Sequence, residues 1–211
     1  MKNQKISNNV IRRLPRYIRH LDSLAEEGVT RVSSSELGSQ MGLTASQVRQ
    51  DFNCFGGFGQ QGYGYTVDEL RNQLSAILGM NENRSAIIIG AGNLGRAIIR
   101  NFKFSHCGVS LKAAFDLKDR FPSRAPDTPP FYDISELDDY LTENPTDIAV
   151  LTLPGSLANE TAAKLVSYGV KGIWNFTNVE LTGIPENVIV ENVHFSDSLL
   201  ALGYYLSQSI K

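Results

Sequence analysis

The sequence has little of several features that would define a protein class. Cys54 and Cys107 are its only cysteines among 211 residues, too few for a disulfide scaffold and typical of a reducing compartment. Its apolar runs are short, as at Ala86–Ile89, so no segment is long enough to span a membrane. The basic residues near the start are not followed by an apolar stretch, so no secretory signal is expected. These absences predict a cytoplasmic protein without a membrane partner.

The sequence also has almost no net charge, with 20 Lys and Arg against 22 Asp and Glu. The hydrophobic content of 42% and charged content of 20% are those of a globular protein, and the length suits one large domain or two small ones. The first 31 residues depart from this balance, with seven basic residues against three acidic ones. A nucleic-acid-binding segment would show this excess, although on charge alone a solvated basic helix is favoured.

Helical patterns fill the first 55 residues. Apolar residues three and four apart predict a helix over residues 10–24. The segments Ser33–Glu36 and Thr44–Gln47 both have the pattern of a capping box, in which a hydroxyl side chain and an acid or amide three residues later satisfy the helix start. Two short helices joined at Gly42 form a helix-turn-helix arrangement.

Aromatic residues alternate with glycines in the next segment, residues 55–65. This regularity favours a β-hairpin wing over a flexible glycine loop. Residues 1–80 are therefore predicted to form a winged-helix DNA-binding domain. The residues predicted to contact DNA are Arg12, Arg13 and Arg16 in the first helix, Ser46, Gln47, Arg49 and Gln50 in the recognition helix, and Gly59 and Gln60 in the wing.

From residue 81 onward, short apolar runs alternate with helical stretches. This pattern predicts an α/β domain over residues 81–193, a Rossmann fold with a parallel sheet and crossover helices. The expected strands are Ala86–Ile89, Leu111–Phe115, Asp147–Leu153, Gly172–Phe176 and Val188–Val190.

A glycine motif joins the first of these strands to a helix. It reads Gly90-Ala91-Gly92-Asn93-Leu94-Gly95, and in this strand–turn–helix setting it predicts a dinucleotide site, with a turn that binds nothing as the alternative. The phosphates would lie on the N–H groups at the start of the helix. Asp116 ends the next strand, where a carboxylate would bind the ribose hydroxyls of NAD and disfavour NADP. Lys118 and Arg120 lie close enough in sequence to weaken that preference.

The sequence offers no evident catalytic group. A dehydrogenase needs an acid or base beside the nicotinamide. The three histidines, His20, His106 and His194, do not follow a central strand, and neither cysteine has metal-ligand spacing. No catalytic or metal-binding residue is therefore expected.

An apolar stripe marks the last predicted helix, residues 194–211. A short terminal helix cannot bury such a stripe alone, so it either packs on its own Rossmann domain or is exchanged in a homodimer. The stripe consists of Phe195, Leu199, Leu202, Leu206 and Ile210, widened by Tyr204 and Tyr205.

Taken together, the chain resembles the redox-sensing transcriptional repressor Rex family over essentially its whole length. The motifs that carry the resemblance are Gln47–Phe52, Phe55–Gly59, Gly90–Gly95, Leu151–Pro154 and Asn175–Thr177. The resemblance implies a homodimer that binds palindromic operator DNA, exchanges its terminal helix and leaves DNA when NADH rises. It also implies cofactor contacts from Thr152 and Pro154, and from Phe195 to the nicotinamide of the partner subunit.

Five positions depart from the family pattern. Gln50, Gln60 and Gln61 replace basic residues, Asn101 replaces a tyrosine, and His194 replaces an acid. The sequence thus predicts an NADH-responsive repressor without catalytic activity. A small NAD-dependent oxidoreductase with an N-terminal extension, and a nucleotide-sensing scaffold whose winged helix binds protein, are the alternatives.

Overall fold

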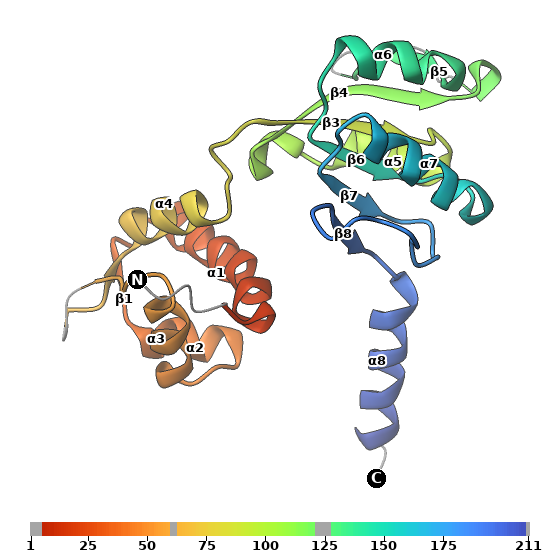
Figure 1. Ribbon diagram of the computed structural model, residues 1–211. Helices are drawn as coiled ribbons and strands as arrows, with labels where there is room; N and C mark the ends of the chain where they lie inside the picture. The colour runs from red at the N-terminus through yellow and green to blue at the C-terminus, as the bar shows by residue number, and fades with distance from the viewer. Residues whose placement is uncertain (1–5, 60–62, 121–127, 210–211) are drawn as a thin grey trace. The chain divides into compact units, whose positions relative to one another are not determined.

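The chain divides into two compact units. The computed structural model describes residues 6–59, 63–120 and 128–209. The first unit comprises Met1–Asn81 and the second Glu82–Lys211 (Figure 1).

The described residues of the first unit form four helices and a two-stranded antiparallel sheet. Both predicted capping boxes are present, with Ser33 paired to Glu36 and Thr44 to Gln47, and Gly42 ends its helix in the left-handed conformation. The elements are α1 (Asn8–Glu26), β1 (Arg31–Val32), α2 (Ser34–Met41), α3 (Ala45–Asn53), β2 (Tyr65–Thr66) and α4 (Val67–Ile77).

The wing segment, residues 55–65, is described on either side of residues 60–62. Val32 pairs with Tyr65, so β2 pairs with a strand that precedes α2. The turn of the hairpin predicted within residues 55–65 falls on residues 60–62, which lie outside the described residues. Gly56, Gly57 and Gly59 have φ values of 105°, 78° and 77°, which form turns and not a regular strand. The predicted residues Gln60 and Gln61 lie outside the described part of the chain.

In the second unit, the described residues form a six-stranded parallel sheet with the order β5-β4-β3-β6-β7-β8. The five predicted strands correspond to β3, β4, β6, β7 and β8, whereas β5 was missed. The strands are β3 (Arg84–Ile89), β4 (Val109–Asp116), β5 (Phe131–Asp133), β6 (Ile148–Leu151), β7 (Gly172–Asn175) and β8 (Ile189–Asn192).

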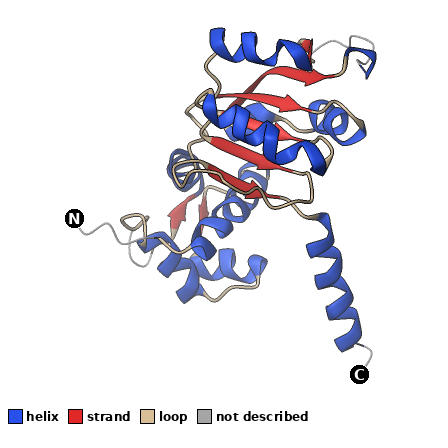
Figure 2. Ribbon diagram, turned by 45° about the vertical axis from the view of Figure 1, so that its right-hand side comes forward, coloured by secondary structure: helices blue, strands red, loops and turns tan. Residues whose placement is uncertain are grey.

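Helices lie on both faces of this sheet (Figure 2). One face packs against α6 (Leu137–Glu143) and α7 (Gly155–Ser167), and the other against α5 (Asn93–Asn101). Short 3-10 helices cover Phe104–Cys107, Lys118–Arg120 and Ile134–Glu136. The strand order reverses on either side of β3, because β4 lies on one side and β6 on the other. In open α/β sheets, ligands bind at the carboxyl ends of the strands at such a reversal.

The last helix, α8 (Phe195–Ser209), has no buried residue and extends from the end of β8 (Figures 1 and 2). Leu199 and Leu200 are 69% and 72% exposed. The α5 face of the sheet also carries an apolar groove of about 340 Å³, lined in part by Phe102, Val150 and Trp174. Two apolar surfaces of this unit are therefore left without a full intramolecular cover.

Candidate nucleotide and nucleic-acid sites

The glycine turn lies at the strand-order reversal. Gly90 follows β3 with φ of 100°, and a Cβ added there would lie 2.7 Å from the carbonyl oxygen of Thr152. A Cβ on Gly95 would lie 2.0 Å from the carbonyl oxygen of Gly90. Only residues without a Cβ allow α5 to approach β3 and the loop after β6 this closely.

Gly92 occupies the N-cap of α5 and differs from the other two glycines. Its φ of −67° suits any residue, and nothing lies within 4 Å of a Cβ added there. No side chain caps this helix start, and its first turn has no acidic residue. The space beside Gly92 and the N–H groups of Asn93, Leu94 and Gly95 thus suit a dinucleotide pyrophosphate.

Asp116 has a role at this turn that the spacing of the motif did not predict. Its side chain is buried at the end of β4; Oδ2 accepts a 2.6 Å hydrogen bond from the N–H of Ala91, and Oδ1 accepts one from Leu117. The carboxylate therefore holds the glycine turn in place. Its contact with ribose remains a prediction.

The loop after β6 forms the opposite side of the turn. The hydroxyl of Thr152 donates a 2.6 Å hydrogen bond to the carbonyl oxygen of Gly90, and Pro154 is the N-cap of α7. The structure therefore brings Thr152 to the glycine motif, and its contact with the cofactor stays a prediction.

Charges of both signs lie just after β4 and at the end of β5. Lys118 is exposed, and its N–H donates to Asp133 Oδ2 at 3.0 Å. Hydrogen bonds from the Ser135 hydroxyl and N–H are the main cause that lowers the pKa of Asp133, with a smaller contribution from Lys118. The side chain of Arg120 lies outside the described residues.

A polar network connects the residues just before α8 to the end of the sheet, and the sequence analysis did not predict it. His194 Nε2 lies 3.1 Å from Glu180 Oε1, and Asn192 donates to the other oxygen of Glu180 at 2.6 Å. Asn175 donates in turn to Asn192 at 2.8 Å. The sequence marks two parts of this network, the motif Asn175–Thr177 and the departure at His194, but not their contact through Glu180. The network fixes the chain immediately before Phe195, whose ring centroid lies 6.1 Å from that of Phe176.

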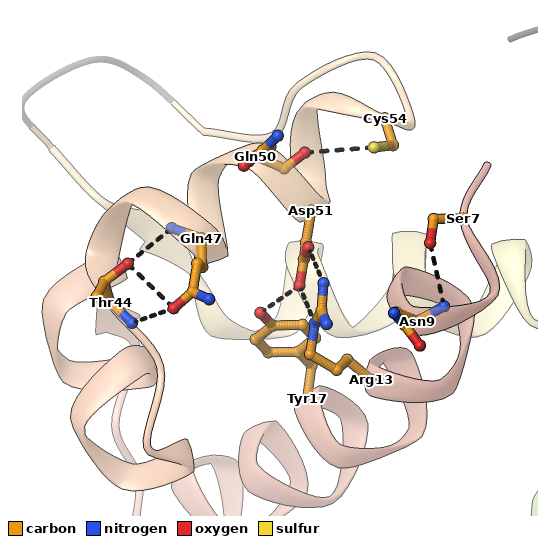
Figure 3. A network of polar contacts seen from close by, with 9 residues as sticks. All are labelled: Ser7, Asn9, Arg13, Tyr17, Thr44, Gln47, Gln50, Asp51 and Cys54. Atoms are coloured by element: carbon orange, nitrogen blue, oxygen red, sulfur yellow. Dashed lines mark hydrogen bonds and ion pairs between the residues drawn. The ribbon is translucent and has the colours of Figure 1, made fainter.

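In the first unit, α3 exposes one face and buries the other. Ser46, Arg49 and Gln50 are exposed, as a recognition helix requires. Gln47 is also exposed, but its Oε1 accepts from the N–H of Thr44 at 2.9 Å in the capping box (Figure 3). A groove of about 750 Å³ runs between this helix and the wing, lined by residues that include Arg49 and Gly59.

The three arginines predicted to contact phosphate are not equivalent. Arg12 is exposed. The Nη2 group of Arg16 donates to the carbonyl oxygen of Met41 at 2.9 Å, at the end of α2. Arg13 forms two hydrogen bonds to the buried carboxylate of Asp51, 2.6 and 2.7 Å long (Figure 3). No local sequence pattern marks Arg13 as a partner of Asp51, which lies 38 positions further along the chain.

The parts of the chain that the structure covers contain neither a metal-binding cluster nor a membrane-spanning helix. Among residues 6–59, 63–120 and 128–209, no group of three His, Cys, Asp or Glu side chains could hold a metal ion. No helix within the same ranges is long and apolar enough to cross a membrane.

Comparison with family models matches both units. Residues 5–53 match the family described as "Putative DNA-binding protein N-terminus", and residues 81–179 match the family described as "CoA binding domain".

Two relatives carry the name redox-sensing transcriptional repressor Rex. The protein from Thermoanaerobacter pseudethanolicus is 48% identical over 207 residues, which are 98% of this chain and 92% of the relative. The protein from Clostridium botulinum is 49% identical and covers 95% of both chains.

Solved structures give the same result. A crystal structure of RSP in complex with β-NAD⁺ and operator DNA has a TM-score of 0.89 and is 47% identical in sequence. The match covers 98% of this chain and 95% of the RSP chain. A complex of RSP with β-NADH has a TM-score of 0.88 and 44% identity, covering 98% of this chain and 97% of its own. The chain belongs to the Rex family of redox-sensing transcriptional repressors.

Proposed function

We propose that this protein binds operator DNA as a homodimer, represses transcription, and is released when NADH binds. The observation that carries this proposal is the presence in one chain of an exposed recognition helix and an open glycine turn at the strand-order reversal. The RSP structure, 47% identical over nearly the whole chain, contains both NAD⁺ and operator DNA. Because the family consists of repressors, we assign no catalytic reaction to the nucleotide site.

The three parts of the chain have separate roles in this proposal. Residues 1–80 bind DNA, residues 81–193 bind NAD(H), and residues 194–211 dimerise. The match to a CoA-binding family model is compatible with this division, since that model describes a Rossmann-type domain and the structural relatives hold NAD⁺ and NADH.

Backbone amides and one carboxylate would hold the dinucleotide. The turn Gly90–Gly95 binds the pyrophosphate at the start of α5, because the helix dipole and the first N–H groups attract an anion there. Asp116 holds the turn and faces the ribose, while Thr152 and Pro154 border the opposite side. The bound nicotinamide supplies the redox-dependent charge, and the chain's own residues distinguish its two forms.

Dimerisation would cover the apolar surfaces that one chain leaves open. The exposed stripe of α8 needs an apolar partner surface, and the apolar groove on the α5 face shows that the sheet still has one. Exchange of α8 across a two-fold axis would bury both and place two recognition helices to read a palindrome.

Substitution Gly92→Val tests the pyrophosphate site. The backbone of Gly92 accepts a side chain without strain, so the fold should persist while the valine fills the space that the pyrophosphate needs. NADH binding, measured by calorimetry, should be lost, whereas operator binding without NADH should equal that of the wild type. Unchanged NADH affinity would show that the nucleotide does not bind at this turn.

Substitution Arg49→Ala tests the recognition helix. If Arg49 contacts a base, the variant should lose about 1–3 kcal/mol of operator binding. Arg100→Ala, which removes an exposed arginine from the other unit, is the matched control and should bind as the wild type does. Equal affinities of the two variants in fluorescence anisotropy would show that α3 does not read the operator.

Truncation after Asn192 tests the dimer. Because the truncated chain lacks the α8 stripe, it should sediment as a monomer and lose binding to a two-half-site operator. A stable dimer in sedimentation velocity would contradict helix exchange.

Substitution Phe195→Ala tests the switch. NAD⁺ has a cationic nicotinamide and NADH a neutral one, so an apolar ring beside it favours the reduced form. Release requires that NADH bind one dimer geometry better than the other. The coupling free energy between NADH binding and operator binding is then about 1–3 kcal/mol, and by reciprocity operator DNA weakens NADH binding by the same factor. The variant should bind operator DNA nearly as the wild type does but release it poorly when NADH is added. The release is followed by fluorescence anisotropy, and sedimentation velocity checks that the variant is still a dimer. Normal NADH sensitivity would exclude Phe195 from sensing.

A further inference from the structure

A carboxylate is buried on the inner face of the recognition helix. Asp51 is 2% exposed and lies in α3 beside Val48 and Phe52, on the opposite face from Ser46 and Arg49. A buried carboxylate needs partners, because desolvation disfavours its charge. Its carboxylate is held from α1, the helix whose Tyr17 packs on Phe52 of α3.

Arg13 and Tyr17 supply these partners (Figure 3). Nη2 of Arg13 donates to Oδ1 of Asp51 at 2.6 Å, and Nε donates to Oδ2 at 2.7 Å. The hydroxyl of Tyr17 donates to Oδ2 at 2.9 Å. The hydrogen bond to Asp51 is the main cause that raises the pKa of Arg13, and burial is the main cause that raises the pKa of Tyr17.

This contact is directional in a way that apolar packing is not. Two parallel N–H groups of a planar guanidinium fit two carboxylate oxygens only in one relative orientation. The ring of Tyr17 also packs on Phe52, the residue after Asp51, with centroids 4.9 Å apart. A rotation of α3 about its axis would break both hydrogen bonds of the pair, while most apolar contacts of the helix could readjust.

We infer that the Arg13–Asp51 pair is a positioning device that sets the rotation of the recognition helix, and that Arg13 acts through Asp51 without contacting phosphate. The inference rests on the proposed operator binding. Arg13 presents two of its donors to Asp51, and its side chain is 26% exposed, whereas its neighbour Arg12 is on the exposed side of α1. Buried ion pairs of this kind can confer one specific arrangement of a fold.

A comparison of lysine and phenylalanine variants tests the inference. Arg13→Lys keeps the positive charge but cannot form the planar pair, and Tyr17→Phe removes one hydrogen bond from Asp51 while keeping the ring. Binding is measured by fluorescence anisotropy on the operator duplex of RSP and on a scrambled duplex of equal length. The measurement is made at several salt concentrations and at a temperature well below the melting temperature of each variant. We expect Arg13→Lys to weaken operator binding about tenfold and Tyr17→Phe about threefold, in line with loss of hydrogen bonds to a charged group.

The salt dependence separates positioning from phosphate contact. Removal of a phosphate contact lowers the slope of log affinity against log salt by about 0.9. Arg12→Gln should show that change, whereas Arg13→Gln should keep the wild-type slope, and neither Arg13 variant should weaken binding to scrambled DNA. NADH affinity should be unchanged in all of these variants.

Three results would overturn the inference. The first is wild-type operator affinity in both Arg13→Lys and Tyr17→Phe. The second is a flattened salt slope in Arg13→Gln that matches Arg12→Gln. The third is equal loss on operator and scrambled duplexes. If Arg13→Lys does not fold, Tyr17→Phe decides by the same measurements. A wild-type protein that does not distinguish the operator from any other duplex would instead contradict the proposed function.

Discussion

The close approach of α5 to the end of β3 is the constraint on which the nucleotide site depends. A Cβ on Gly95 would lie 2.0 Å from the Gly90 carbonyl oxygen, so no other residue type fits without moving the helix. This contact aims the start of α5 at the strand-order reversal. It also brings the Ala91 N–H within 2.6 Å of Asp116 and the Gly90 carbonyl within 2.6 Å of the Thr152 hydroxyl. In contrast to Gly90 and Gly95, Gly92 has open space where a Cβ would lie.

The DNA-binding unit has a corresponding centre in the ring of Phe52. Its centroid lies 4.9 Å from that of Tyr17, 5.4 Å from that of Phe58 and 5.2 Å from that of Tyr65. One residue of α3 therefore contacts α1 and both ends of the wing segment. Offset and edge-to-face rings add about 0.5–1.5 kcal/mol per pair to the free energy of burial, so the recognition helix and the wing are held as one surface. The Arg13–Asp51 pair adds an orientation to this apolar contact.

Much of this arrangement could be predicted from the sequence, because its signals are local. Capping boxes, β-branched strands and the glycine motif each lie within a few consecutive residues, and each is present as expected. The missed features depend on residues far apart in sequence. Pairing of Val32 with Tyr65 and of Arg13 with Asp51 joins segments 33 and 38 positions apart, and no local pattern marks either partner. The short strand β5 lacks the apolar run of the central strands, since it lies at the sheet edge.

The two units become one regulator only if nucleotide binding changes how the dimer holds DNA. Phe195 is the first residue of α8; the His194–Glu180 contact precedes it and the exposed helix follows it. The most direct test measures the affinity of the full-length wild-type protein for the RSP operator duplex while NADH or NAD⁺ is titrated at constant salt. Our account predicts that NADH lowers operator affinity by roughly 5- to 150-fold while NAD⁺ leaves the complex intact. Equal release by both nucleotides, or none by either, would contradict it.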